Sequence, residues 1–207
     1  MKKQDFVVRF AGEGGQGVVT SAEGLAQAAA QVGYYVQTFA TFPSQILGGP
    51  TWTQTRIANQ PVLSSGDSLD VLVVFNQEAY DDHHDQVAEG GVVIFDSGEF
   101  ALEREGPTLG MPFDELAKST GNARAANMVI IGALAYLVKM PLEYLEQFVT
   151  VRFTRGRAGD DEIIKANIQA LSLGHEKAAE SGFSLGELAD PKPPKGEQVL
   201  LKGTDAI

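Results

Sequence analysis

The chain has 207 residues, of which 43% are hydrophobic and 21% charged, and its formal net charge is −11. This composition is typical of one globular domain with its own core, and the negative charge argues against nucleic-acid or anionic-membrane partners. The lack of cysteine excludes disulfides, cysteine-ligated zinc and cysteine-bound iron–sulfur clusters within these residues. With neither a membrane-spanning apolar run nor a signal-peptide pattern, the sequence predicts a cytoplasmic protein.

The first predicted strand, residues 6–11, leads through a glycine-rich run into a predicted helix at 18–30. The glycines of this run match the spacing G-x-G-x-x-G, and N–H groups at the start of a helix attract a phosphate or carboxylate. A tight turn that needs glycine for packing alone is the alternative. The predicted anion-binding residues are Gly12, Gly14, Gly15, Gln16, Gly17 and Val18.

The second predicted strand, residues 34–38, argues against a nicotinamide cofactor. A dinucleotide site needs an Asp or Glu at the end of this strand, about 20 residues after the glycines. No acidic residue occurs between Gly24 and Gly66, and Arg56 is the only basic one. An NAD(P)-dependent oxidoreductase therefore stands only as an alternative function.

The stretch from Gly24 to Gly66 is poor in charge and contains the only tryptophan, Trp52. Depletion of charge together with aromatic side chains is typical of the core of a protein–protein interface, and a hairpin folded onto its own domain is the alternative. A strand is predicted at 51–57, with residues 61–64 as its hairpin partner. In the loop at 41–50, the residues predicted to face a ligand are Thr41, Pro43 and Ser44.

Residues 69–75 and 91–95 are nearly continuous apolar runs, as in parallel strands that are covered on both faces. Asn76 and Asp96 follow these runs, at the strand ends where open α/β sheets bind ligands, so we predict both as site residues. Capping of the next turn is the alternative role for each. Between the two runs a polar helix is predicted at 77–89, with His83 and His84 on its surface.

The remaining predicted elements complete a three-layer, Rossmann-like α/β domain with a largely parallel, mixed sheet and a hairpin insert, spanning residues 1–186. They are a strand at 109–111 and helices at 112–119, 123–139, 142–149 and 160–180. Residues 187–207 are predicted as a proline-rich linker and the start of a following domain.

The predicted loop before the last helix carries Arg152, Arg155 and Arg157. These side chains could grip an anion, since the arginine fork matches both phosphate and carboxylate geometry. A solvated loop in which they pair with the acids at 160–162 is the favoured interpretation. The sequence predicts no metal site and no catalytic side chain.

Two blocks, residues 12–20 (GEGGQGVVT) and 42–56 (FPSQILGGPTWTQTR), resemble the gamma domain of 2-oxoacid:ferredoxin oxidoreductases. Residues 70–76, 90–96 and 121–128 continue the resemblance, which covers roughly residues 5 to 180. In that family the gamma unit is either a separate subunit or is fused ahead of the alpha unit. Residues 199–207 resemble the opening of the alpha unit, as in 2-oxoglutarate oxidoreductases, so 2-oxoglutarate is the first choice of substrate.

The resemblance implies an enzyme complex in which thiamine diphosphate decarboxylates the oxoacid, an iron–sulfur carrier passes electrons to ferredoxin, and coenzyme A takes the acyl group. It places thiamine in a beta subunit and the gamma domain beside the coenzyme A path, docked to the alpha unit and inactive alone. A glycine-rich loop suits the coenzyme A pyrophosphate. Glu13, within that loop, is then expected to point to solvent or to a basic partner, because it would repel a phosphate.

Overall fold

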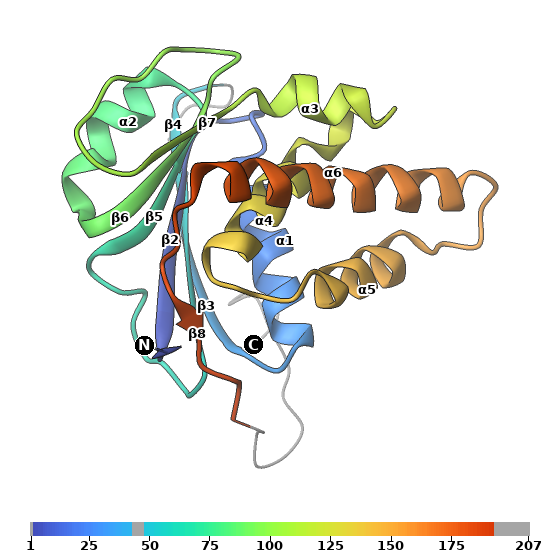
Figure 1. Cartoon of the computed structure of the whole chain (residues 1–207), viewed down its shortest axis with the longest axis horizontal. Coiled ribbons are helices and arrows are strands. Elements are labelled where there is room, and N and C mark those ends of the chain that lie inside the picture. Colours follow the sequence, from blue (N-terminus) through green and yellow to red (C-terminus); the bar gives the residue numbers. More distant parts are fainter. Residues whose placement is uncertain (1, 43–47, 193–207) are drawn as a thin grey trace.

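A six-stranded sheet runs through the part of the chain that the computed structural model describes, residues 2–42 and 48–192 (Figure 1). The strands of this sheet, in spatial order, are β3 (Tyr35–Thr41), β4 (Pro50–Ala58), β2 (Asp5–Glu13), β5 (Leu69–Val74), β6 (Val87–Asp96) and β7 (Thr108–Met111). A separate short pair joins β1 (Lys2–Lys3) to β8 (Glu187–Leu188).

The sheet is largely parallel, as the apolar runs predict. β2, β5, β6 and β7 run parallel to one another, whereas β4 is antiparallel to both of its neighbours, β2 and β3. The hairpin is therefore made by β3 and β4. The prediction that residues 61–64 pair with the strand at 51–57 is wrong, because β2 and β3 already occupy both edges of β4.

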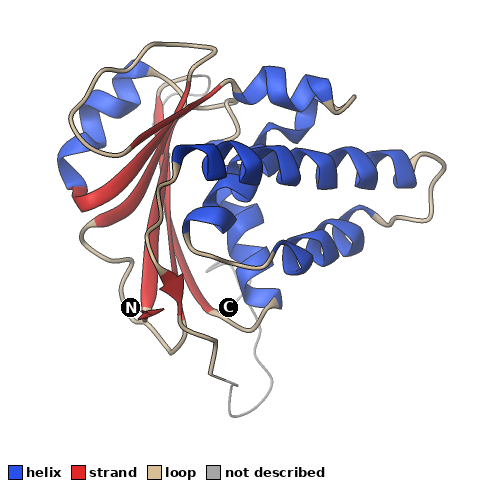
Figure 2. Ribbon diagram, in the orientation of Figure 1, coloured by secondary structure: helices blue, strands red, loops and turns tan. Residues whose placement is uncertain are grey.

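Helices cover both faces of the sheet, which confirms the predicted three layers (Figure 2). The helices that share the larger core cluster are α1 (Val18–Gln31), α3 (Phe113–Ser119), α4 (Ala126–Leu137), α5 (Leu142–Phe153) and α6 (Asp160–Ser181), with the 3-10 helix η2 (Ala123–Ala125) before α4. The opposite face is covered by α2 (Gln77–His83), which continues into the 3-10 helix η1 (His84–Gln86).

Side chains of β2 alternate between the two core clusters. Val8 and Phe10 are fully buried on the α1 side, and Val7 and Ala11 are buried on the α2 side. A strand buried on both faces reads as a continuous apolar run, which is why the sequence signal for these strands was strong. The core therefore holds the carboxyl end of β2, and the loop that follows it, in a fixed place.

Two helix boundaries differ from the sequence prediction by more than three residues. The polar helix expected at 77–89 ends at His83, and Val87 already begins β6, where it pairs with Leu69. β-branched Val87 favours a strand, and the positive φ of Gly90 (77°) accompanies a register shift in the pairing of β5 with β6. The helix expected at 142–149 continues to Phe153, so Arg152 lies on α5.

The last described residues pack on the body of the domain. Leu188 in β8 is buried in the larger core cluster, and Ala189 N donates a hydrogen bond to Lys3 O. The first residues of the segment predicted as a linker, 187–207, are therefore part of the folded body. The rest of that prediction, at 193–207, lies outside the described residues. Within the described residues, no helix combines the length and apolar character needed to cross a membrane.

Candidate functional site

The glycine-rich loop joins the end of β2 to the start of α1 at the carboxyl edge of the parallel strands. Residues 13–16 are exposed to solvent, whereas Gly12 and Val18 at the two ends of the loop are buried. The backbone turns through positive φ at Gly15 (102°) and Gly17 (93°), a region that side chains disfavour. The loop is therefore open outward and anchored at both ends.

Three of the four glycines of this loop are required, for two different reasons. A Cβ at Gly12 would lie 2.6 Å from Gln16 Oε1 and 3.0 Å from Phe75 Cβ, so packing excludes a side chain there. Gly15 and Gly17 are required by their φ angles. Gly14 has no positive φ, and the nearest described atom to its Cβ position is Gly48 N at 4.0 Å. Neither packing against described residues nor backbone conformation explains why position 14 is a glycine.

The N-terminus of α1 presents uncapped N–H groups beside Gly14. Gly17 occupies the N-cap position, and no side chain among the described residues accepts a hydrogen bond there. The first turn also contains no acidic residue. Since the first N–H groups of a helix lack intrahelical acceptors and carry partial positive charge, this end of α1 is suited to an anion.

Gln16 and Asn76, two of the predicted site residues, brace the loop. Gln16 Oε1 accepts a hydrogen bond from Glu13 N at 2.7 Å and another from Asn76 Nδ2 at 3.3 Å. Asn76 also caps α2, because its Oδ1 accepts from Ala79 N at 2.9 Å. The structure thus brings these two side chains together and gives each a structural role, and direct contact with a ligand stays a prediction.

Asp96 ends β6, two strands away from β2, and its carboxylate is turned into the backbone. Oδ1 accepts hydrogen bonds from Gly98 N at 3.0 Å and from Phe113 N at 3.3 Å. Burial raises the pKa of this carboxyl group, while the two backbone hydrogen bonds oppose that rise. The capping role considered for Asp96 is what the geometry shows, and its contact with a ligand is untested.

Two described residues that flank the β3–β4 connection, Thr41 and Gly48, bear on the predicted site. Thr41, at the end of β3, pairs with Trp52, and its Oγ1 lies 3.5 Å from Trp52 O. Gly48, at the other end of the connection, faces Gly14. Pro43 and Ser44, both predicted to face a ligand, lie outside the described residues.

Acidic side chains gather on the α2 side of the loop. Glu13, Glu78 and Asp82 line a small hollow of about 10 Å³, enough for roughly one water molecule. Glu13 is exposed, as expected for a residue that must not face a phosphate. An anion is therefore excluded from the α2 side and favoured at the Gly14 and α1 side.

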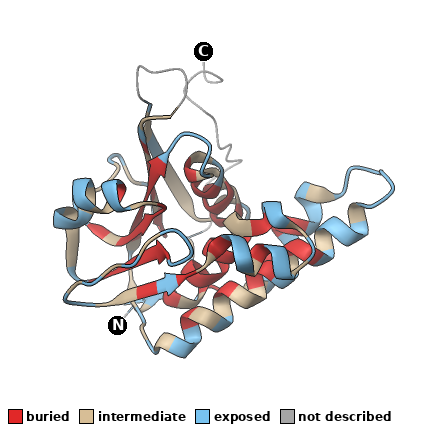
Figure 3. Cartoon of the chain, turned by 90° about the horizontal axis from the view of Figure 1, so that it is seen from above, coloured by how far each residue is buried: buried red, intermediate tan, exposed pale blue. Residues whose placement is uncertain are grey.

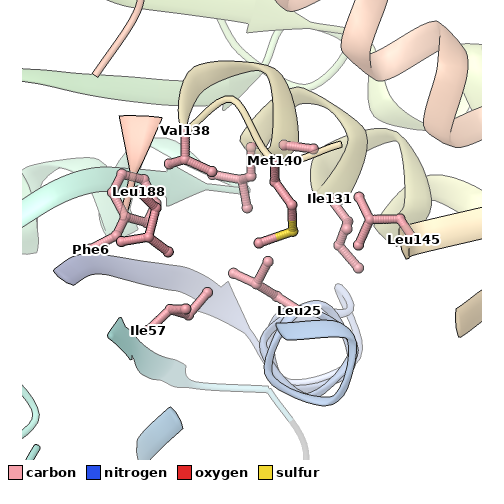
Figure 4. Close-up of a pocket in the computed structure, with 10 residues that line it drawn as sticks. Phe6, Leu25, Ile57, Ile131, Val138, Met140, Leu145 and Leu188 are labelled. Carbon is pink, nitrogen blue, oxygen red and sulfur yellow. The ribbon is translucent and has the colours of Figure 1, made fainter. Parts of the chain in front are cut away.

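Two further hollows lie away from this loop. The first is a void of about 10 Å³ between the sheet, α1 and α4, and its lining is apolar (Figure 4). It is a packing gap in the core and offers no polar group for a ligand. The second is an open groove of about 540 Å³ beside the turn from α4 to α5, lined by Tyr136, Lys139 and His175 among others.

Arg9 was not predicted from the sequence as a residue of interest, and it is the centre of a buried polar cluster on the α2 side. Its side chain donates to Gln54 Oε1 at 2.6 Å and to Gln86 Oε1 at 2.6 Å, and Nη1 lies 3.2 Å from His83 Nδ1. The Trp52 ring covers the guanidinium, with its centroid 4.3 Å from Cζ. The expected surface position of the two histidines holds for His84, which is exposed, whereas Arg9 and Trp52 partly bury His83.

The chain matches the family described as pyruvate ferredoxin/flavodoxin oxidoreductase over residues 7–177. It is 34% identical to ketoisovalerate oxidoreductase subunit VorA of Methanothermobacter thermautotrophicus over 84% of this chain and 36% of that subunit. The chain thus spans about a third of the length of the first curated relatives that it matches.

Two solved structures show the same architecture. The first is 2-oxoglutarate:ferredoxin oxidoreductase from Magnetococcus marinus with 2-oxoglutarate, coenzyme A and succinyl-CoA bound, with a TM-score of 0.80 and 32% identity over 94% of this chain and 34% of that one. The second is the gamma subunit of a keto/oxoacid ferredoxin oxidoreductase from Geobacter sulfurreducens, with a TM-score of 0.70 and 27% identity over 86% of this chain and 99% of that one. The resemblance found in the sequence is confirmed, and the chain belongs to the pyruvate ferredoxin/flavodoxin oxidoreductase family.

Proposed function

We propose that this chain is the gamma-type unit of a thiamine-dependent 2-oxoacid:ferredoxin oxidoreductase, which converts a 2-oxoacid to an acyl-CoA, and that 2-oxoglutarate is the substrate. The similarity to the Magnetococcus marinus enzyme, which is named for 2-oxoglutarate, supports this choice. The full length of the Geobacter sulfurreducens gamma subunit matches this chain, which supports assignment to the gamma unit. In this proposal, thiamine diphosphate and the iron–sulfur cluster belong to the rest of the complex; for the cluster, the lack of cysteine in the 207 residues supports this placement.

The role proposed for the glycine-rich loop is to hold the pyrophosphate of coenzyme A. The observation that carries this role is Gly14, which precedes the uncapped N-terminus of α1 and where a side chain would meet no described atom closer than 4.0 Å. Backbone N–H groups of the first turn of α1 would bind and orient the phosphates. The loop supplies binding and orientation only, and no side chain of this chain is assigned a catalytic role.

A second proposed role is docking to an alpha-type domain or subunit and to the thiamine-binding beta subunit, with ferredoxin reached through the complex. Phe39 on the edge strand β3 is 51% exposed, and its ring packs on Trp52 at a centroid distance of 5.5 Å. Arg56, the one charged residue of the stretch 24–66, is paired with Asp5. The β3–β4 face therefore presents exposed aromatic surface, and the one charge of this stretch is neutralised by an ion pair. Both features are typical of interface cores.

The coenzyme A role is tested by Gly14→Val in the assembled enzyme. We expect the KM for coenzyme A to rise at least about tenfold, because the new side chain fills the ligand space and about 1.4 kcal/mol of binding corresponds to a factor of ten. The KM for 2-oxoglutarate and the thermal unfolding midpoint should change little, since an exposed site tolerates substitution to within about 0.5 kcal/mol. Ala101→Val, at an exposed position outside the loop, is the matched control.

An unchanged KM for coenzyme A in Gly14→Val, with normal turnover, would contradict this role and leave the loop as a packing turn in an interface module.

The NAD(P) alternative makes a different prediction. In that case the chain would bind NADH in a fluorescence titration, whereas the charge-poor stretch after the glycines lacks the acidic residue that holds the ribose.

A further inference from the structure

Helix α2 connects the buried Arg9 cluster to the glycine-rich loop. It lies on the outside of the sheet and is exposed along most of its length, with Ala79 as its one buried residue (Figure 3). At its N-terminus Asn76 donates to Gln16 of the loop, and at its C-terminus His83 lies beside Arg9. Because few core contacts hold so short a helix, the side-chain contacts at its two ends have a large share in placing it.

The contact between Arg9 and His83 requires a neutral imidazole. Arginine carries five N–H donors and no acceptor. Since Arg9 Nη1 lies 3.2 Å from His83 Nδ1, Nδ1 must accept the hydrogen bond, and the ring proton must be on Nε2. A proton added to Nδ1 removes this acceptor and places a second positive charge against the guanidinium.

The remaining partners of Arg9 cannot compensate for a second charge. Gln54 and Gln86 are neutral, and both accept from the guanidinium through their amide oxygens. The amide of Gln54 is fixed in this orientation, because its Nε2 donates to the backbone oxygens of Ser65 and Gly66. Among the described hydrogen-bond partners of Arg9, His83 is therefore the one that can gain a charge.

The carboxylates around His83 do not pair with it. They come from β2, α2 and η1 and are Glu13, Glu78, Asp82 and Asp85. None of these four forms an ion pair with His83, and β4 contributes the uncharged ring of Trp52. Burial and the charge of Arg9 lower the pKa of His83 by more than the carboxylates raise it.

His83 also lies at the edge of the glycine-rich loop. It lines the same hollow of about 10 Å³ as Gly12, Glu13 and Asn76. Within the loop, Gln16 Oε1 accepts from Asn76 Nδ2 and from Glu13 N. A displacement of α2 away from β2 would therefore break the contact between Asn76 and Gln16 and loosen the first half of the loop.

We infer that His83 is a pH-sensitive switch for the glycine-rich loop: when Nδ1 takes up a proton from water, α2 separates from Arg9 and the loop loses its brace. The neutral imidazole holds α2 and the loop in the ordered arrangement. The imidazolium releases them, and the loop then binds an anion more weakly. The consequence for coenzyme A rests on the proposed function, whereas the movement of the loop does not.

The test is hydrogen–deuterium exchange of the assembled enzyme without coenzyme A at pH 7.5 and pH 5.0, with each rate divided by the intrinsic rate at that pH. The reporting peptides are 77–86, which covers α2, and 12–18, in which the amides of Glu13 and Gln16 are hydrogen-bonded within the loop. An opening that takes up one proton shifts by up to about tenfold per pH unit, so we expect both peptides to lose protection at least about threefold at pH 5.0.

Two variants of His83 and one control complete this test. His83→Asn places an amide oxygen near the place of Nδ1 and cannot be protonated, so both peptides should keep their protection at pH 5.0. His83→Gln should give the same result, and His84→Asn, which removes the neighbouring exposed histidine, should behave as the parent does. An equal loss of protection in the parent and in both His83 variants would overturn the inference. A loss confined to 77–86 would also overturn it, because the loop would then not follow α2.

The dissociation constant of coenzyme A, measured by calorimetry on the assembled enzyme, separates this inference from the proposed function. Between pH 7.5 and pH 5.0 it should rise at least about threefold more in the parent than in His83→Asn, and this comparison cancels the titration of the ligand's own phosphate near pH 6. A parent loop that loosens without such a rise contradicts the coenzyme A role and leaves the switch in place. A parent loop that stays ordered at pH 5.0 contradicts the switch and leaves the coenzyme A role in place.

Discussion

Arg9 is a cation within an apolar strand, and its neighbours explain how the fold accommodates it. The residue is only 6% exposed, and its described hydrogen-bond partners are neutral side chains of Gln54, His83 and Gln86. The pKa of Arg9 is lowered by burial, with Asp85 acting in the opposite direction. A charge inside the pattern of the strand at 6–11 is the signal that could have identified this cluster from the sequence.

His83 gives this cluster a dependence on pH. Its pKa lies below 6.5 because burial and the charge of Arg9 disfavour the imidazolium, and Asp82 and Asp85 only partly compensate. The unfolded chain therefore binds a proton near pH 6.5 that the folded chain does not bind. The contribution of neutral His83 to the free energy of unfolding is complete above pH 6.5, and it is lost as the pH falls through the folded-state pKa.

His83→Gln should accordingly reduce the loss of stability between pH 7 and pH 5. The measurement is the free energy of unfolding from urea titrations at several pH values, with His84→Gln as the control because His84 is exposed. The control should follow the parent. Parallel curves for the parent and His83→Gln would show that His83 titrates alike in the folded and unfolded chains.

At the glycine-rich loop, the sequence predicted the turn and its place before α1, because the spacing of glycines carries that information. It could not assign a reason to each glycine, since packing against Phe75 and the φ angles of Gly15 and Gly17 depend on the folded chain. It also could not show that Asn76 and Asp96 cap neighbouring turns. Capping and ligand contact are both compatible with a polar residue that follows a buried strand.

The contact between α4 and α6 sets the position of α6 on the domain, and two glycines make this contact possible. A Cβ at Gly174 would lie 1.8 Å from Val129 O, and one at Gly132 would lie 2.0 Å from Leu171 O. The two backbones are therefore in contact. The clash that a larger residue would make with a backbone oxygen cannot be relieved by rotating a side chain. Two helices packed this closely behave as one rigid element.

Gly174→Ala should destabilise the domain by about 3 kcal/mol or more, because the two helices must separate to admit the methyl group. Gly24→Ala in α1 is the matched control. Its Cβ would meet the flexible end of Ile131 at 3.0 Å, and the gain in helix propensity, about 1 kcal/mol, offsets that contact. Thermal or urea unfolding of both variants gives the comparison, and equal stabilities would contradict the packing argument.

Two of the errors in the predicted elements occur where strand pairing decides the outcome. The residues at 77–89 have the polar character of a helix, but pairing of Val87 with Leu69 converts their last part into β6. Residues 61–64 have strand character, but both edges of β4 are already paired with β2 and β3. Gln54 Nε2 of β4 instead donates to the backbone oxygens of Ser65 and Gly66. Local propensity contains no information about which strand edge is available.

At the scale of the whole molecule, the features on which the proposals rest lie at separate places on the domain. The glycine-rich loop opens at the carboxyl edge of the sheet and exposed Phe39 lies on the edge strand β3, whereas the loop between α5 and α6 lies away from the sheet (Figure 1). The sequence predicted the layers and the loop, because these follow from apolar runs and glycine spacing. The direction of α6 was not predicted, since it depends on the glycine contact between α4 and α6.

The central claim, that the glycine-rich loop contacts coenzyme A, is tested most directly by hydrogen–deuterium exchange of the assembled enzyme with and without coenzyme A. Amide exchange in the peptide that covers residues 12–18 should slow when coenzyme A is added, because bound phosphates occupy the exposed N–H groups of the loop and of α1. The peptide at 119–125, another exposed turn, should be unchanged. Unaltered exchange at 12–18 in an enzyme that turns over coenzyme A would contradict the claim.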